Sequence, residues 1–281
     1  MRTFLDCDTC FLRQALDAAR NAHADETLQA GIIKKVLLLL AEMPTTSKPP
    51  EISELVQQIL RAELDNPDPY AALKQSSTQE ALTLLPWLQE VIRNSSDPLD
   101  IPLRLSVAGN IIDFGAAREF NLHEDIQQVL TADFGIYDLE EMKKGLANAK
   151  IILFLADNAG ETVFDKLLIE QIKKPVFYAV KSSPVLNDAT HADAVSAGLD
   201  QVASILETGN AIPGASLEKS TLEFKSLFNT ADLIISKGQG NYEMLSENLE
   251  PIYFLLKAKC AIIARDLQVP VGSFILKKGG Q

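Results

Sequence analysis

Polar side chains follow two short apolar runs of this sequence, at positions where they could share one site. Asp157 and Asn158 come directly after the run at 151–156, and Asp188 follows the next run at 175–180. Carboxylate and amide oxygens are the ligands that hard divalent cations such as Mg²⁺ and Mn²⁺ prefer. The three residues therefore predict a divalent metal site. Taken alone, Asp157 has an equally simple interpretation as the N-cap of the following helix.

Lysines and glycines stand beside these acids. Lys181 and Lys237 are cations suited to neutralising a phosphoryl group. Gly160 and the stretch Gly238–Gly240 would let backbone N–H groups approach an anion, and a helix beginning nearby would direct its positive end there. The combination predicts a metal-assisted phosphate site. The Gly-x-Gly stretch lacks the further residues of a dinucleotide fingerprint or a P-loop.

These residues depend on a sheet to bring them together. Near-continuous apolar runs are typical of strands buried on both faces, as in a parallel sheet. Helical patterns lie between the runs and give a strand–helix–strand rhythm. Ligands of such sheets lie beyond the carboxyl ends of the strands, so the polar residues that follow the first four runs should converge. The five runs are 151–156, 175–180, 201–206, 232–236 and 250–256.

The first hundred residues follow a different pattern. They contain one glycine, Gly31, of the 14 in the chain, and their apolar residues recur at helical spacing. We therefore predict a helical subdomain over residues 1–100 and an α/β catalytic domain over residues 101–281. The segment 101–150 is expected to be helical, with breaks at three glycines: Gly109, Gly115 and Gly135.

Composition narrows the classes of partner. The chain has 281 residues and a net charge of −12, from 26 Lys and Arg against 38 Asp and Glu. Such a surface repels phosphate backbones and anionic lipid, so neither nucleic acid nor a membrane is an expected partner. Three cysteines are too few for a disulfide scaffold. With no signal-peptide core or membrane span in the sequence, we expect a cytoplasmic protein.

Several motifs, taken in order, resemble those of the domain-of-unknown-function-89 family, the damage-control metal phosphatases. The resemblance spans nearly the whole chain, and the N-terminal cysteine pair is similar to the prokaryotic-type branch. The motifs are Cys7-Asp-Thr-Cys10 with Arg13-Gln14, Asp68-Pro69-Tyr70 with Lys74, Gly109-Asn110-Ile-Ile-Asp113, Asp157-Asn158-Ala-Gly160-Glu161, Asn187-Asp188-Ala-Thr190, Lys237-Gly-Gln-Gly-Asn241 with Glu243, and Leu256-Lys-Ala-Lys259-Cys260.

The resemblance implies an N-terminal helical part joined to a three-layer α/β/α domain. It also implies hydrolysis of phosphate esters of small metabolites with a bound divalent cation: Mn²⁺, Co²⁺, Ni²⁺ or Mg²⁺. Asp157, Asn158 and Asp188 would be the metal ligands, and Lys237 the phosphate-binding lysine. The residues assigned to catalysis are Asp157, Asp188 and Lys237. The residues assigned to substrate binding are Asn110, Asp113, Gly160, Glu161, Lys181, Gly238 and Asn241, with Lys181 assigned on its position alone.

Two chemical questions stay open at this level. The nucleophile is either a water deprotonated by a carboxylate, or Asp157 or Asp188 attacking directly. The cysteine pair has metal-ligand or redox spacing, and Cys260 could join Cys7 and Cys10 in a second metal or redox site. The alternative for all three cysteines is a set of small buried residues with no chemistry.

Two other functions compete with a phosphatase. A non-catalytic protein that binds a phosphorylated metabolite would use the same residues without turnover. A methyltransferase would use the same kind of sheet, but it requires a glycine-rich loop after an early strand. The loop after 151–156 instead has one glycine and two candidate metal ligands, which favours the phosphatase.

Overall fold

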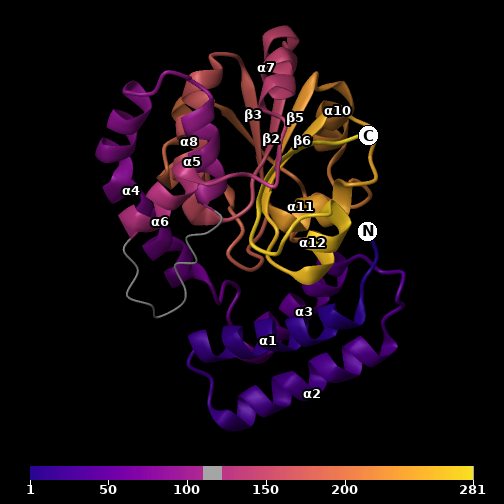
Figure 1. Ribbon diagram of the computed structural model, residues 1–281. Helices are drawn as coiled ribbons and strands as arrows, with labels where there is room; N and C mark the ends of the chain where they lie inside the picture. The colour runs from indigo at the N-terminus through magenta and orange to yellow at the C-terminus, as the bar shows by residue number, and fades with distance from the viewer. Residues whose placement is uncertain (110–121, 281) are drawn as a thin grey trace.

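The computed structural model describes residues 1–109 and 122–280, and within them the chain forms a seven-stranded sheet covered by helices (Figure 1). The strand order is β1-β7-β6-β5-β2-β3-β4. The strands are β1 (Ile136–Tyr137), β2 (Ile152–Leu155), β3 (Val176–Val180), β4 (Ser204–Glu207), β5 (Leu233–Lys237), β6 (Ile252–Lys257) and β7 (Phe274–Lys278).

The five strands predicted from apolar runs are β2 to β6, and all five are parallel. Two further strands at one edge were not predicted. β7 runs antiparallel to β6, and β1 pairs in parallel with β7. β1 is only two residues long and β7 ends in Lys277-Lys278, so neither presents a long apolar run.

Helices cover both faces of the sheet, which confirms the predicted three-layer architecture. Alternation along each strand divides the side chains between two cores. Ile152 and Phe154 of β2 join one core, whereas Leu153 and Leu155 join the other. The first core is closed by α5 (Asp100–Ala108), α7 (Leu139–Asn148), α8 (Thr162–Ile172) and α9 (His191–Ser196). The second is closed by α10 (Leu222–Thr230), α11 (Gly238–Leu245) and α12 (Ala261–Leu267).

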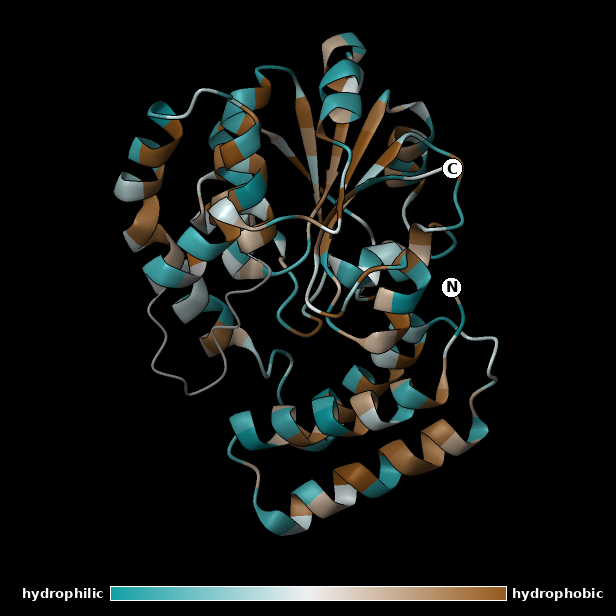
Figure 2. Cartoon of the chain, viewed as in Figure 1, coloured by the Kyte–Doolittle hydropathy of each residue, from teal (hydrophilic) through white to brown (hydrophobic). Residues whose placement is uncertain are grey.

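Three N-terminal helices form a unit with a core of its own, which we call the three-helix cap: α1 (Leu5–Asn21), α2 (Glu26–Glu42) and α3 (Pro49–Leu64). In Figure 1 the cap lies beside α11 and α12. It is attached by polar contacts that include Lys48 Nζ donating to Met244 O at 2.9 Å and Arg61 Nη1 donating to Pro184 O at 3.0 Å. Figure 2 shows apolar residues along the strands of the sheet and also along α2.

The remaining helices extend one outer layer. α4 (Ala71–Arg93) and α6 (Leu122–Thr131) pack with α5 and α8 in a fourth apolar cluster. α4 thus belongs by its packing with the α/β layers, although it lies within the first hundred residues; the division at residue 100 stays a prediction. None of the helices in the described part of the chain is long and apolar enough to cross a membrane.

We predict that Leu60→Ala loosens the cap without loosening the sheet. Leu60 is fully buried in the core of the cap, and truncating a buried leucine costs about 2–5 kcal/mol of stability. Amide hydrogen exchange should show lost protection in α1–α3 and unchanged protection in β2 and β5. Equal loss of protection in both regions would show instead that the cap and the sheet unfold as one unit.

Candidate metal and phosphate site

The loops that follow β2 and β3 pair with each other and bring the predicted metal ligands together. Asn158 and Asp188 form an isolated antiparallel bridge. The N–H of Ala189 donates to Asp157 O and the N–H of Ala159 donates to Asn187 O, each at 2.8 Å. Asp157, Asn158 and Asp188 all line one cavity. The predicted convergence of the three side chains is therefore present in the fold.

This cavity, of about 560 Å³, lies between the cap and the carboxyl ends of the strands. The cap supplies residues from α1 and α3, and the α/β domain supplies the strand-end loops and the first residues of α11 and α12. Its polar lining includes Arg2, Asp6, Cys7, Cys10, Gln14, Ser53, Asp157, Asn158, Asn187, Asp188, Gln239, Glu243, Lys259 and Cys260.

Gly238 is required because Asp157 lies directly against it. Gly238 has a φ of +80°, and a Cβ added there would be 1.9 Å from Asp157 Oδ2. No side chain fits in that space, and the left-handed backbone also favours glycine. Gly238 therefore makes room for the carboxylate of Asp157, in addition to any contact it makes with substrate.

Asn241 fixes two strand ends. Its Nδ2 donates to Ala156 O at 3.0 Å and to Lys237 O at 2.7 Å, and its side chain is buried. These bonds connect the end of β2 to the end of β5. Asn241 does not line the cavity described above, and its contacts are those of a residue that holds the site together.

Lys237 points away from the cavity. Alternation along β5 places it on the same face as Leu233 and Ile235, towards α8. Its Nζ is fully buried and donates to Glu161 Oε2 at 2.8 Å and Asp165 Oδ1 at 2.7 Å. Burial alone would lower the pKa of Lys237, but Asp165 and Glu161 raise it, so the ammonium stays charged. The geometry gives no direct support for the predicted phosphate contact.

Glu161 lies between this lysine and the metal ligands. It is buried, in the short 3₁₀ turn η1 (Ala159–Glu161), and its Oε1 accepts a hydrogen bond from Asn158 Nδ2 at 2.6 Å. Gly160 is buried in the same turn. Neither residue lines the cavity. Both lie in the loop after β2 and support Asn158 without facing the cavity.

Lys181 forms an ion pair with Asp188. Its buried Nζ donates to Gly214 O at 2.9 Å and lies 3.6 Å from Asp188 Oδ2. Burial lowers the pKa of Lys181, although the charge of Asp188 opposes that change. Lys181 faces a second pocket of about 540 Å³ that also contains Lys74 and His191. From this position Lys181 can orient Asp188, whereas it does not line the first cavity, where a phosphate would bind.

The site as a whole has an excess of negative charge. When all its groups are ionised, the four carboxylates of the inner cluster outnumber its two ammonium groups by two, and the exposed Lys259 offsets part of that excess. The members are Asp157, Glu161, Asp165, Asp188, Lys181 and Lys237, all buried except the half-buried Asp157. Uncompensated charge is costly inside a protein. One divalent cation would balance this excess.

Burial is the main cause that raises the pKa values of the two candidate ligand carboxyls. Burial, with the charges of Glu161 and Asp188, raises the pKa of Asp157 well above its usual value. Burial also raises the pKa of Asp188 to about 6, against the opposing charge of Lys181. Two carboxylates and an amide are a fitting oxygen donor set for a hard cation.

The amide of Asn158 is oriented so that its oxygen remains for such a cation. Nδ2 donates both to Glu161 Oε1 and to Asp157 Oδ2, the second bond being 3.2 Å long. Because both N–H bonds are used, Oδ1 is the atom with which Asn158 would reach a metal. In the described part of the chain, no three or more His, Cys, Asp or Glu side chains form a metal-ligand group, and this set has two carboxylates plus the amide.

The three cysteines line the same cavity. Cys7 and Cys10 come from α1 and Cys260 precedes α12, so chain segments far apart in sequence place them there. All three are free thiols. Burial raises the pKa of Cys7 and of Cys10, which favours the thiol over the thiolate. Their predicted role as a second metal or redox site stays a prediction.

Some site residues lie elsewhere or went unpredicted. Asn110 and Asp113 lie outside the described residues. Lys259 and Glu243 line the cavity and were not assigned roles from sequence. Lys259 could have been found by applying the strand-end rule to the fifth run, which it follows. Burial raises the pKa of Glu243 to about 7, an effect that only the folded chain shows.

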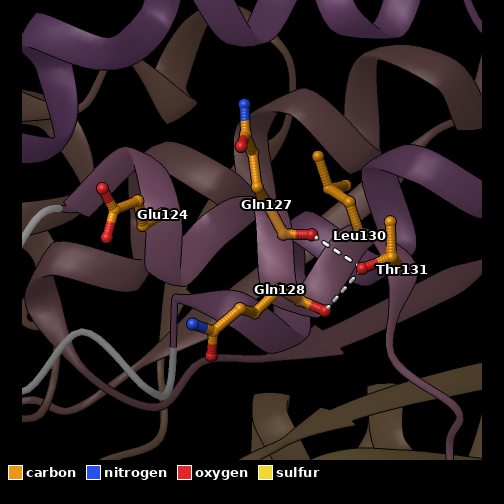
Figure 3. A pocket seen from close by; sticks show the side chains of 5 residues that line it. All are labelled: Glu124, Gln127, Gln128, Leu130 and Thr131. Atoms are coloured by element: carbon orange, nitrogen blue, oxygen red, sulfur yellow. Dashed lines mark hydrogen bonds between the residues drawn. The ribbon is translucent and has the colours of Figure 1, made fainter.

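A third pocket, of about 440 Å³, lies on α6 and holds none of the predicted site residues (Figure 3). Thr131 Oγ1 donates there to the carbonyl oxygens of Gln127 and Gln128 of its own helix. Its lining consists of Glu124, Gln127, Gln128, Leu130 and Thr131.

Comparisons with known proteins agree with this geometry. Residues 3–275 match the damage-control phosphatase ARMT1-like domain. An uncharacterized protein from Methanocaldococcus jannaschii is 37% identical, over 97% of this chain and 94% of that protein. A damage-control phosphatase from Pyrococcus horikoshii is 34% identical, over 98% of this chain and 97% of that protein. The crystal structure of a DUF89 family protein from Pyrococcus horikoshii matches with a TM-score of 0.91 and 33% identity, over 99% of each chain.

The fold and these relatives define a phosphatase class built on a three-layer α/β/α sheet. The chain belongs to the damage-control phosphatase ARMT1-like domain family, which confirms the resemblance found in the sequence. Assignment to the branch with the N-terminal cysteine pair stays a prediction.

We predict that the metal-free protein loses stability as the pH rises through about 6. A carboxyl whose pKa is raised on folding binds its proton more tightly in the folded state, so the free energy of unfolding falls as that proton is lost. Asp157→Asn removes one such carboxyl. At pH 8 without metal, the variant should therefore be more stable than the wild type and unfold at a higher temperature.

Thermal unfolding at pH 4.5 and pH 8 tests this, with Asp200→Asn, at an exposed position, as the matched control. Mn²⁺ should stabilise the wild type more at pH 8 than at pH 4.5 and should leave Asp157→Asn unchanged. A wild type that gains stability relative to Asp157→Asn as the pH rises would contradict the charge argument.

Proposed function

We propose that this protein is a divalent-metal-dependent phosphatase that hydrolyses phosphate esters of small metabolites, as part of metabolite damage control. The observation that carries the proposal is a largely buried cluster with more carboxylates than ammonium groups around Asp157, Asn158 and Asp188, which line a cavity between cap and sheet. Membership of a damage-control phosphatase family supports the reaction class.

Asp157, Asn158 and Asp188 would hold the cation through their side-chain oxygens. When bound, it supplies positive charge to the phosphoryl oxygens of the substrate. Gly238 leaves the space that Asp157 occupies, and Lys181 orients Asp188. The donor set is suited to Mn²⁺, Co²⁺, Ni²⁺ or Mg²⁺, and the choice among them belongs to the proposal.

Lys259 is the cation best placed to contact the phosphate. It is exposed, it lines the cavity beside the candidate ligands, and its charge acts on Asp157. The first turn of α11 also reaches the cavity through Gln239 and Gly240, so its N–H groups can hydrogen-bond an anion. This assignment gives Lys259 the role that the sequence predicted for Lys237.

Glu243 is placed to hold or release a proton. Its pKa of about 7 lets it exist in either form near neutral pH, and Gln239 Nε2 donates to its Oε1 at 2.9 Å. We assign it the proton that the departing alcohol takes up. The nucleophile is either a water or the carboxylate of Asp157 or Asp188.

We infer the class of substrate from the volume of the cavity and the net charge of the chain. A volume of about 560 Å³ suits a small metabolite. The net charge of −12 continues to disfavour nucleic acid. A reducing cytoplasm, in which Cys7, Cys10 and Cys260 stay as free thiols, is the proposed location.

We predict phosphate release that depends on added metal. Metal-stripped protein is assayed with sugar phosphates, nucleotides and cofactor fragments, each with Mg²⁺, Mn²⁺, Co²⁺ and Ni²⁺. Asp157→Asn should lose at least about 100-fold in rate because it removes a ligand charge, and Asp200→Asn should match the wild type. Metal-dependent binding of a substrate without release in any combination would show a binding protein and contradict the phosphatase.

We predict that Lys259→Met raises KM by about 10-fold, the effect of losing one partly solvated charge-assisted bond to the phosphate. Steady-state kinetics on the best substrate measures it. Lys34→Met, at an exposed position on α2, is the control. An unchanged KM and kcat would remove Lys259 from the site.

A further inference from the structure

A chain of buried polar side chains runs from the interior of the α/β domain to the candidate metal ligands. It begins at Asp165 of α8, which is fully buried. Its Oδ1 accepts from Ser106 Oγ at 2.7 Å and its Oδ2 from Tyr178 OH at 2.8 Å. Donors from α5 and β3 therefore fix the position of this carboxylate.

Lys237 extends the chain towards the site. Its ammonium bridges Asp165 and Glu161, at 2.7 and 2.8 Å, with no exposure to solvent. One lysine between two carboxylates leaves neither of them free to rotate without losing a charge-assisted bond. The position of Glu161 is thereby set by residues on four elements, α5, β3, α8 and β5.

Glu161 in turn selects one orientation of the Asn158 amide. With Nδ2 between Glu161 Oε1 and Asp157 Oδ2, both contacts are hydrogen bonds. The opposite orientation would place the amide oxygen against two carboxylate oxygens, which repel it. The amide oxygen of Asn158 is therefore the atom that would coordinate a metal ion.

We propose that Glu161, Lys237 and Asp165 are positioning residues, which hold the amide oxygen of Asn158 in place as a metal ligand. The inference rests on the proposed function, because it requires a cation at Asp157, Asn158 and Asp188. It gives Lys237 and Glu161 a role at the site without contact with substrate. Partners of this kind typically contribute 10–100-fold to metal affinity.

The alternative role for Lys237 is direct contact with the phosphate. That contact would require Nζ to leave Glu161 and Asp165, which would then be two buried carboxylates without a cation. Such a rearrangement is strongly unfavourable. The positioning role instead uses the contacts that the fold already makes.

The test is the affinity of metal-free protein for Mn²⁺, measured by calorimetric titration of the whole chain, with phosphate release as a second readout. Glu161→Gln should weaken Mn²⁺ binding by about 10–100-fold. At saturating Mn²⁺ much of its kcat should return, and KM for the phosphate ester should stay close to that of the wild type.

Glu161→Asp separates orientation from charge. It keeps the carboxylate but shortens the reach to Asn158, so a positioning role predicts a loss of affinity similar to that of Glu161→Gln. If charge alone mattered, Glu161→Asp would bind Mn²⁺ like the wild type, and the proposal would fail. Asp165→Asn and Tyr178→Phe lie further along the chain and should give progressively smaller losses, which keeps the test decisive if a Glu161 variant does not fold.

Two control variants test whether a general loss of charge or of stability could change the affinity for Mn²⁺. Glu141→Gln removes an exposed carboxylate on α7 and should not change Mn²⁺ affinity. Ile235→Val weakens packing on the face of β5 that carries Lys237, and it should lower thermal stability without changing Mn²⁺ affinity.

The outcomes distinguish this inference from the proposed function. If the wild type binds Mn²⁺ and Glu161→Gln binds it equally well but with a raised KM, the positioning role is wrong. If the wild type binds no divalent cation in the panel, the proposed function itself fails, and the positioning role fails with it.

Discussion

The structure depends on one electrostatic constraint, which is the gathering of more carboxylates than ammonium groups at the carboxyl ends of the strands. Asp157 and Asp188 approach each other because the loops after β2 and β3 pair through their backbones. Lys181 lies 3.6 Å from Asp188, whereas Lys237 is held by Glu161 and Asp165, so ionising both ligand carboxyls would place like charges together in a largely buried site. A divalent cation would resolve that conflict, and such a cation could also stabilise the charge of a phosphoryl group.

The fold arranges the supporting groups by simple rules. Alternation along β5 sends Lys237 to the inner face, where it meets two acids from η1 and α8, and leaves Gly238 to make room for Asp157. The cap closes the cavity from outside with residues of α1 and α3. The parts of the site thus differ in purpose: one set would hold the cation, one would fix that set, and the cavity lining, with Lys259, would meet the substrate.

The sequence shows which polar residues follow the strands, but it does not show in which direction their side chains point. Asp157, Asn158 and Asp188 follow long apolar runs, and the rule that parallel strands end at one edge brings them together. Lys237 also follows an apolar run, but it is the last residue of β5. The face on which its side chain lies is set by the alternation of side chains along that strand. Asn241 and Glu161 make hydrogen bonds within the protein, and the sequence alone does not distinguish this role from substrate binding. β1 and β7 lacked an apolar run, and the raised pKa of Glu243 arises only from burial.

The proposed function requires one divalent cation between Asp157, Asn158 and Asp188. Anomalous diffraction from crystals grown with Mn²⁺, recorded on either side of the manganese absorption edge, tests it most directly. We expect one strong peak within coordination distance of oxygens from all three side chains, and no such peak at that position in Asp157→Asn crystals. A peak elsewhere, such as among Cys7, Cys10 and Cys260, with none between these three side chains, would contradict it.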